Sequence, residues 1–216
     1  MAGGGRLKKN GTIMLKLILA SKSPRRIEIL SSLGYKFQII PAQGEEFVDF
    51  SLTPEKIVQN VARGKAEEIF SSLSPEQKSQ TVVIGMDTVV AFRGEILQKP
   101  KSDDDERRML NELSGNVHEV WTGYCLIACG KRICGAERSS VKFNVLSNET
   151  VEAYVKSGLG MDKAGGYGVQ DGCGLVEGVE GSYYNVMGFN KETMQKLLSA
   201  YELEKVNQPA VGSCWH

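Results

Sequence analysis

Short apolar runs and segments of helical periodicity alternate along most of the chain. The apolar run over residues 15–20 predicts a buried strand that leads into a helix, with Ser23 as its N-cap and Pro24 as its first residue. This helix is expected to reach about Leu33, and a second strand is predicted over residues 35–40. The chain therefore begins with a strand–helix–strand unit.

Helical periodicity is strongest after Thr53 and Pro54, which open the next predicted helix. Its apolar residues recur every three or four positions, at Ile57, Val58, Val61, Ala62, Ile69 and Phe70. A strand is predicted over residues 81–92, and a turn at Gly94 reverses it into a short strand over residues 95–98.

The second half of the chain continues this alternation. Its predicted elements are a helix over residues 103–113, a hairpin of strands over 117–128 and 133–146, a helix over 148–157, and a last helix after Asn190. No helix or strand is assigned to the glycine-rich residues 158–181. The alternation of strands and helices predicts an α/β fold in which helices cover a mixed sheet.

The length of 216 residues suits one substantial α/β domain, which could fold as two lobes. We expect this domain to span residues 13–205, between a flexible N-terminal extension, 1–12, and a flexible C-terminal tail, 206–216. A hydrophobic share of 41% with 24% charged residues is ordinary for a globular protein, so extensive disorder is not expected.

The charge balance narrows the classes of partner. Lysine and arginine together number 26, as do aspartate and glutamate, whereas a general binder of nucleic acid or of membrane surfaces needs a basic excess. No segment reaches the length that a membrane span requires. Lys8 and Lys9 precede an apolar stretch, but Lys16 interrupts it, so we interpret the stretch as the first strand and not as a signal peptide.

Cysteine and histidine usage points to a cytoplasmic protein without a zinc site. The five cysteines are odd in number and have no paired C-x-x-C spacing, so reduced thiols are expected. Only His118 and His216 are available as imidazole ligands. The same scarcity weighs against a Ser-His-Asp hydrolase.

Asp87 is a carboxylate in the middle of the apolar strand predicted over residues 81–92. Burying an ionised aspartate is costly unless a cation, a metal ion or hydrogen bonds compensate its charge. A structural aspartate bonded to the backbone, with Thr88 as a cap, would explain the pair. A metal ligand or a general base is the alternative that we favour.

Arg25 and Arg26 lie at the second and third positions of the first predicted helix, where positive charge opposes the helix dipole. A bound polyphosphate would remove this conflict, because helix N-termini and guanidinium groups both bind phosphate oxygens. Two solvated arginines, one of them paired with Glu28 or Glu46, are the other interpretation, and the two are about equally plausible for this motif alone.

Two lysines are further candidates for phosphate contacts. Lys65 projects from the apolar stripe of its helix, where snorkelling to the surface is the simpler explanation. Lys99 precedes Pro100 at the end of a strand and is similarly ambiguous. By contrast, the acidic run 103–106 follows the N-cap Ser102, so it is expected to complement the helix dipole and not to bind metal.

The glycine-rich stretch contains Asp162 and Lys163, followed by three glycines within four residues, which allow a close approach of backbone to a ligand. It is neither a Walker loop nor a Rossmann fingerprint, since neither pattern occurs in the chain. Glycine richness alone leaves an ordinary loop equally open.

Together these segments resemble the Maf-like nucleoside triphosphate pyrophosphatases from about Leu17 to about Leu198. The matching motifs, in chain order, are Ala20-Ser21-x-Ser23-Pro24-Arg25-Arg26, Glu46, Lys65, Asp87-Thr88-Val89, Lys99-Pro100, Leu113-Ser114-Gly115, Asp162-Lys163-Ala164-Gly165-Gly166-Tyr167-Gly168-x-Gln170, Gly181-Ser182 and Asn185-Val186-x-Gly188. Several spaced motifs in one order make the resemblance specific.

The resemblance implies an elongated α/β fold of the Maf and inosine triphosphate pyrophosphatase type, with two lobes around a central cleft. It implies a cytoplasmic homodimer that hydrolyses a nucleoside triphosphate to the monophosphate and pyrophosphate with Mg²⁺ or Mn²⁺. Asp87 matches the catalytic acid and, with Glu46, the metal-associated positions. The positions that match phosphate contacts are Ser21, Arg25, Arg26, Lys65 and Lys99.

Three further positions match those that separate the branches of the family. Arg25, Thr88 and Gln170 resemble the branch that acts on dTTP and UTP, and differ from the branch that acts on 7-methyl-GTP. We therefore expect pyrimidine nucleotides, including modified ones, as substrates in nucleotide-pool housecleaning. The alternatives are a pyrophosphatase for purine analogues such as inosine triphosphate, and a nucleotide-binding regulator without turnover, in line with the family's association with septum formation and division arrest.

Overall fold

The computed structural model describes residues 14–44 and 48–206. The predicted N-terminal extension, 1–12, and all of the predicted tail except Val206 lie outside the described residues, as does Glu46.

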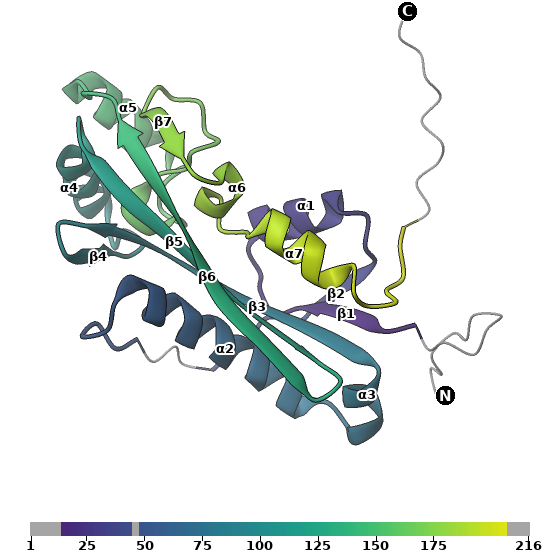
Figure 1. Cartoon of the computed structure of the whole chain (residues 1–216). Coiled ribbons are helices and arrows are strands. Elements are labelled where there is room, and N and C mark those ends of the chain that lie inside the picture. The colour runs from purple at the N-terminus through teal and green to yellow at the C-terminus, as the bar shows by residue number, and fades with distance from the viewer. Residues whose placement is uncertain (1–13, 45–47, 207–216) are drawn as a thin grey trace, which may run out of the picture.

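A mixed seven-stranded sheet forms the centre of the molecule (Figure 1). The strands are β1 (Lys16–Leu19), β2 (Phe37–Ile39), β3 (Thr81–Phe92), β4 (Glu95–Leu97), β5 (Val117–Ala128), β6 (Lys131–Phe143) and β7 (Val176–Glu180). Their order is β2-β1-β3-β5-β6-β7, with β4 paired to β3. The pairs β1–β2 and β1–β3 are parallel, and the other pairs are antiparallel.

The helices are α1 (Pro24–Ser32), α2 (Pro54–Ser72), α3 (Pro75–Ser79), α4 (Asp103–Leu113), α5 (Asn148–Ser157), α6 (Tyr183–Val186), α7 (Lys191–Leu198) and the 3₁₀ helix η1 (Ala164–Gly166). The predicted α/β fold is confirmed, and the longer elements begin and end close to their predicted residues. The short elements α3, η1, β7 and α6 were not predicted; η1 and β7 lie within the glycine-rich residues 158–181, where no hydrophobic period is visible.

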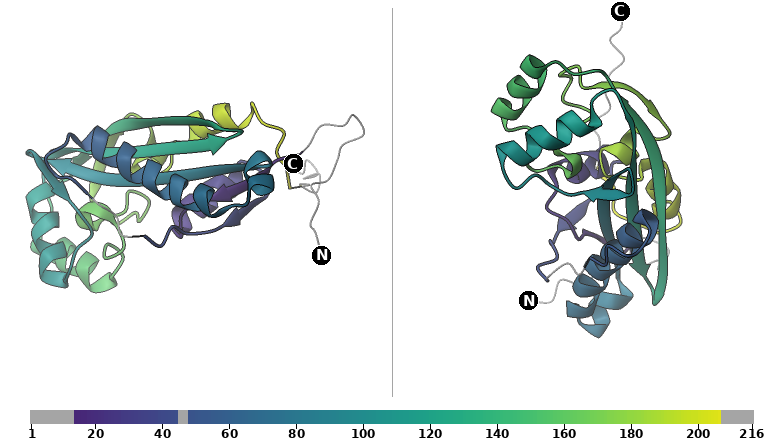
Figure 2. Two further views of the ribbon diagram at one scale, coloured as in Figure 1. Left: turned by 90° about the horizontal axis from the view of Figure 1, so that it is seen from below. Right: turned by 90° about the vertical axis from the view of Figure 1, so that its left-hand side faces the viewer.

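Two helical layers cover the sheet, and the long strands β3, β5 and β6 run through the whole length of the molecule (Figures 1 and 2). Helix α2 packs on one face, against Val83 and Val89 of β3. On the opposite face, α1 and α7 pack over one end of the strands, and α4 and α5 pack over the other end. The two ends of this face correspond to the two lobes.

Helix α2 lies unusually close to the sheet because glycines face it. A Cβ atom at Gly85 would lie 2.2 Å from the carbonyl oxygen of Ala62, and one at Gly123 would lie 2.4 Å from that of Val58. No side chain can occupy either position without moving the helix. The backbone of α2 therefore rests directly on β3 and β5.

The prediction of five reduced cysteines is wrong for one pair. Cys125 and Cys134 lie directly opposite each other in the β5–β6 ladder and form a disulfide. Their sequence spacing gives no sign of this, because strand pairing and not sequence distance brings them together. Cys129 and Cys173 are free, and Cys214 lies outside the described residues.

The acidic run lies in the first turn of α4 after its N-cap Ser102, as predicted, but Glu106 differs from its neighbours in burial. Its side chain is fully buried, and one carboxylate oxygen lies beside the backbone of Gly160. Burial raises the pKa of this carboxyl, which favours its neutral form. Asp104 and Asp105 instead form ion pairs with Arg107 and Arg108 on the helix surface.

His118 is a buried core residue. Its Nε2 shares a hydrogen bond of 2.7 Å with the hydroxyl group of Tyr167, and its ring packs edge-on against Phe143. Burial lowers the pKa of His118 to about 4, so the imidazole is neutral at pH 7.

No helix in the described part of the chain is long and apolar enough to cross a membrane.

We expect His118 to make the fold sensitive to mild acid. The pKa of His118 is lower in the folded state than in the unfolded state, so unfolding takes up a proton as the pH falls below about 6.5. The free energy of unfolding should drop by about 2 kcal/mol between pH 7 and pH 5 through this residue. Denaturant unfolding of the wild type and His118→Gln at both pH values measures the difference, and equal pH dependence of the two proteins would contradict it.

Candidate active site

The site lies at a gap in the sheet. The pairing of β1 with β3 ends at Leu19 and Ile84, and the pairing of β4 with β3 begins at Val90 and Leu97. Between these points, residues 85–89 of β3 have no strand on that side among the described residues. A cavity of about 590 Å³ opens here, lined by residues 20–26, 87–90, 96–99, 162–164 and 167–170 together with Lys65.

Asp87 and Lys65 form an ion pair inside this cavity. The ammonium group of Lys65 donates to Oδ1 of Asp87 at 2.8 Å, and each side chain is only 15% exposed. The two residues meet because Asp87 follows Gly85 on the face of β3 that α2 covers. Lys65 therefore does not extend into solvent, as snorkelling requires, and the partner of Asp87 is an ammonium group and not the backbone.

Arg26 is buried and holds several elements together. Its guanidinium group donates to the carbonyl oxygen of Gly188 at 2.9 Å, the carbonyl oxygen of Met86 at 3.0 Å, Oγ of Ser21 at 3.2 Å and Oγ1 of Thr88 at 3.0 Å. Met86 lies on the stretch of β3 that lacks a strand neighbour, so Arg26 supplies a donor that a neighbouring strand would otherwise supply. It is not a solvated residue, and its phosphate contact stays a prediction.

Thr88 points to the face of β3 opposite Asp87, into a buried polar network. Thr122 donates its one hydroxyl hydrogen to the carbonyl oxygen of Asn185 at 2.8 Å. In the 3.0 Å contact between the two threonine hydroxyl groups, Thr88 is therefore the donor. Because Arg26 also donates to Thr88, the hydroxyl group of Thr88 has only a lone pair left for a ligand.

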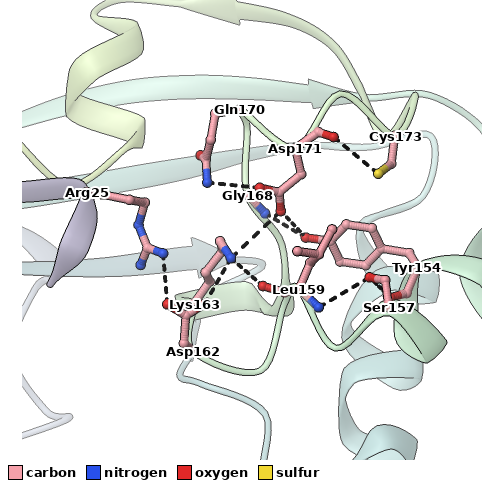
Figure 3. A network of polar contacts seen from close by, with 10 residues as sticks. All are labelled: Arg25, Tyr154, Ser157, Leu159, Asp162, Lys163, Gly168, Gln170, Asp171 and Cys173. Carbon is pink, nitrogen blue, oxygen red and sulfur yellow. Dashed lines mark hydrogen bonds and ion pairs between the residues drawn. The ribbon is translucent and has the colours of Figure 1, made fainter. Parts of the chain in front are cut away.

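Arg25 differs from its neighbour Arg26 in exposure and in partner. Its side chain is 22% exposed, and its Nη1 donates to Oδ2 of Asp162 at 2.9 Å, so its acidic partner is Asp162 and not Glu28. Burial opposes ionisation of Asp162, but hydrogen bonds from Lys163 and Arg25 outweigh it and lower the pKa of Asp162. This ion pair joins α1 to the glycine-rich stretch across the cavity (Figure 3).

A second carboxylate organises the end of the glycine-rich stretch. The side chain of Asp171 is 8% exposed and accepts hydrogen bonds from the hydroxyl group of Tyr154 at 2.5 Å and from Nε2 of Gln170 at 3.0 Å (Figure 3). The ammonium group of Lys163 lies 3.8 Å from the same carboxylate. Asp171 and Tyr154 were not predicted as site residues, because no spacing rule relates a residue of α5 to this loop.

The remaining predicted residues differ in burial and in their position relative to the cavity. Ser21 is buried at the cavity wall, where its Oγ also accepts from the backbone N–H of Ser23 at 3.3 Å. Lys99 is an exposed side chain on the same cavity. Glu46 lies outside the described residues, so its predicted metal role stays a prediction.

The acidic side chains of the cavity limit how a metal ion could bind. No group of three or more potential metal ligands occurs among the described residues. Oδ2 of Asp87 accepts no hydrogen bond from any described residue, so the carboxylate keeps one oxygen for another ligand. This fits Mg²⁺, which is commonly held by one or two carboxylates together with phosphate oxygens and water.

The chain is similar in sequence to proteins of one known family. The family model described as "Maf-like protein" matches residues 16–201. The chain is 47% identical over 182 residues to a dTTP/UTP pyrophosphatase of Thermococcus gammatolerans, covering 84% of this chain and 94% of that protein. It is 40% identical over 197 residues to a dTTP/UTP pyrophosphatase of Caldicellulosiruptor saccharolyticus, covering 89% and 98% of the two chains.

The two adjacent arginines should differ in their effect on stability. Arg26→Lys keeps the charge but cannot serve four acceptors, so we expect the free energy of unfolding to fall by about 2–4 kcal/mol. Arg25→Lys is the matched control, and it should change stability by no more than about 0.5 kcal/mol, because its ion pair is partly exposed. Denaturant unfolding of both variants tests this, and equal stabilities would show that the buried hydrogen bonds of Arg26 contribute little.

Proposed function

The chain belongs to the family of Maf-like proteins, and from this premise we propose that it is a nucleoside triphosphate pyrophosphatase. Its proposed substrates are dTTP, UTP and related or modified pyrimidine nucleotides, which it hydrolyses to the monophosphate and pyrophosphate. The names of the relatives, the cavity and its charged side chains all support this activity.

The ion pair of Asp87 with Lys65 is the observation that carries the proposal. It places a carboxylate and an ammonium group 2.8 Å apart within a cavity that Arg25 and Lys99 also line. The cations suit a polyanionic substrate, whereas a carboxylate repels one unless it serves the chemistry or holds a divalent cation. A purely structural ion pair would not need the other cations around it.

The proposed reaction is a single displacement by water at the α-phosphorus. Mg²⁺ or Mn²⁺, when bound, would neutralise charge on the polyphosphate, and Asp87 is the residue that would hold it, with Glu46 as a second ligand carried over from the family. Asp87 can also accept the proton of the attacking water. Lys65 orients the Asp87 carboxylate and, with Ser21, Arg25, Arg26 and Lys99, stabilises charge on the departing pyrophosphate.

Base selection is proposed to depend on Arg25, Thr88 and Gln170, which all line the cavity. The lone pair of Thr88 and the amide of Gln170 are polar groups that a base could contact, and their hydrogen bonds to protein fix their orientation. A non-catalytic nucleotide-binding regulator would not require a carboxylate with an uncommitted oxygen at the centre of the cavity. The proposed cytoplasmic location and homodimeric state, like the proposed link to division arrest, rest on resemblance to the family.

Asp87→Asn should abolish most of the activity. The amide cannot accept a proton and is a poor ligand for a divalent cation, so turnover should fall by roughly 10²–10⁴-fold or more. The measurement is pyrophosphate release from dTTP and UTP with Mg²⁺ or Mn²⁺. Asp104→Asn, at a carboxylate that is 95% exposed on α4, is the control and should retain wild-type rates. Near-wild-type turnover by Asp87→Asn would overturn the assignment.

A substrate panel separates the proposed function from its alternatives. The wild type should release pyrophosphate faster from dTTP and UTP than from inosine triphosphate, as judged by kcat/KM. Preference for inosine triphosphate would instead favour the purine-analogue activity. Nucleotide binding in the presence of metal, without pyrophosphate release from any member of the panel, would favour a regulator without turnover.

A further inference from the structure

The side chain of Gln170 lines the cavity, and a neighbouring carboxylate binds its amide group. Its Nε2 donates to Oδ1 of Asp171 at 3.0 Å (Figure 3). A carboxylate has only acceptors, so it can hold the NH₂ end of the amide but not the carbonyl end. Oε1 of Gln170 accepts no hydrogen bond from any residue that the structure describes, and Gln170 lines the cavity. The amide therefore offers a carbonyl oxygen to a ligand.

The Asp171 carboxylate is itself oriented by a donor and a cation on its other oxygen. The backbone N–H of Gly168 donates to the hydroxyl oxygen of Tyr154 at 3.0 Å, so the hydroxyl hydrogen of Tyr154 goes to Oδ2 of Asp171. The ammonium group of Lys163 lies 3.8 Å from the same oxygen, close enough for an ion pair but too far for a hydrogen bond. Oδ1 is then the oxygen that remains for Gln170. The side chain of Asp171 is 8% exposed and its hydrogen bond with Tyr154 is partly buried, which strengthens that interaction.

We propose that Asp171 is a positioning residue for base selection, which orients the Gln170 amide so that the pocket accepts a hydrogen bond from a ring N–H of the base. Uracil and thymine carry such a donor at N3, whereas N3 of cytosine is an acceptor. The carbonyl oxygen of Gln170 would pair with the former and repel the latter. This inference rests on the proposed function, because it assumes that the base of a nucleotide lies beside Gln170.

The network predicts an unusual consequence for Asp171→Asn. Tyr154 donates a hydrogen bond to the Oδ2 position and the Lys163 ammonium group lies 3.8 Å from it, so the amide oxygen of the new asparagine should take that place. Its NH₂ group then faces Gln170 and requires the Gln170 amide to turn over. The NH₂ end of Gln170 would point into the cavity, and the preference would move from uracil toward cytosine.

The experiment compares kcat/KM for UTP and CTP in the wild type and in Asp171→Asn. The wild type should favour UTP, and the ratio of the two values should fall roughly ten-fold or more in the variant, the effect expected when one hydrogen bond to the substrate is lost or reversed. N3-methyl-UTP, which lacks the N3 donor, should be a poor substrate for the wild type. It should lose less relative to UTP in the variant.

Two matched variants distinguish positioning from a merely structural role. In a Gln170→Met background, Asp171→Asn should no longer change the UTP-to-CTP ratio, because the residue through which it acts is absent. Tyr154→Phe removes a hydrogen bond to Asp171 without reversing the polarity of the contact to Gln170, so it should retain the preference for UTP. An unchanged ratio in Asp171→Asn, an equal loss with both substrates, or an effect that persists without Gln170 would overturn the proposal.

Binding measurements separate this inference from the proposed reaction. Calorimetric affinities of the wild type and Asp171→Asn for UMP and CMP report on the base contact without any turnover. A fall in the UMP-to-CMP affinity ratio supports the role of Asp171 even if no pyrophosphate is released. An unchanged ratio overturns it even if the enzyme hydrolyses UTP.

Discussion

The direct packing of α2 on β3 and β5 is the constraint on which the site depends. Gly85 and Gly123 leave no Cβ atoms between the helix and the sheet, so the helix backbone rests on the strands. Gly123 lies directly opposite Asp87 in the β3–β5 ladder. A thicker layer of side chains would move Lys65 away from Asp87, and the carboxylate would be buried without a cation, which is costly.

Because of the gap in the sheet, side chains from both faces of β3 contribute to one site. Successive side chains of a strand point to opposite faces, so Asp87 meets Lys65 of α2 while Thr88 meets Arg26 and Thr122 on the other face. Where β1 has ended and β4 has not begun, both faces open into one cavity. Groups suited to phosphate chemistry and groups suited to reading a base are thereby only one residue apart in the chain.

Local signals in the sequence predicted the longer elements well because their causes are local. Ser102 and Ser147 cap α4 and α5 through their own hydroxyl groups, and the apolar period of α2 requires only its own residues. Arg25 and Arg26 show the limit of such signals. They are identical in type and adjacent on one helix, yet Arg25 is partly exposed and pairs with a carboxylate, whereas Arg26 is buried and donates to carbonyl and hydroxyl oxygens.

The sequence by itself determined the α/β class, the caps of the main helices and the set of charged residues that a polyphosphate site requires. Tertiary structure alone decided which of these charges pair, that Cys125 meets Cys134, and that Asp171 contacts both Tyr154 and Gln170. The physical reason is that hydrogen-bond direction and desolvation depend on neighbours that are distant in the chain. A carboxylate or an amide has a defined role only when its donors and acceptors are in place.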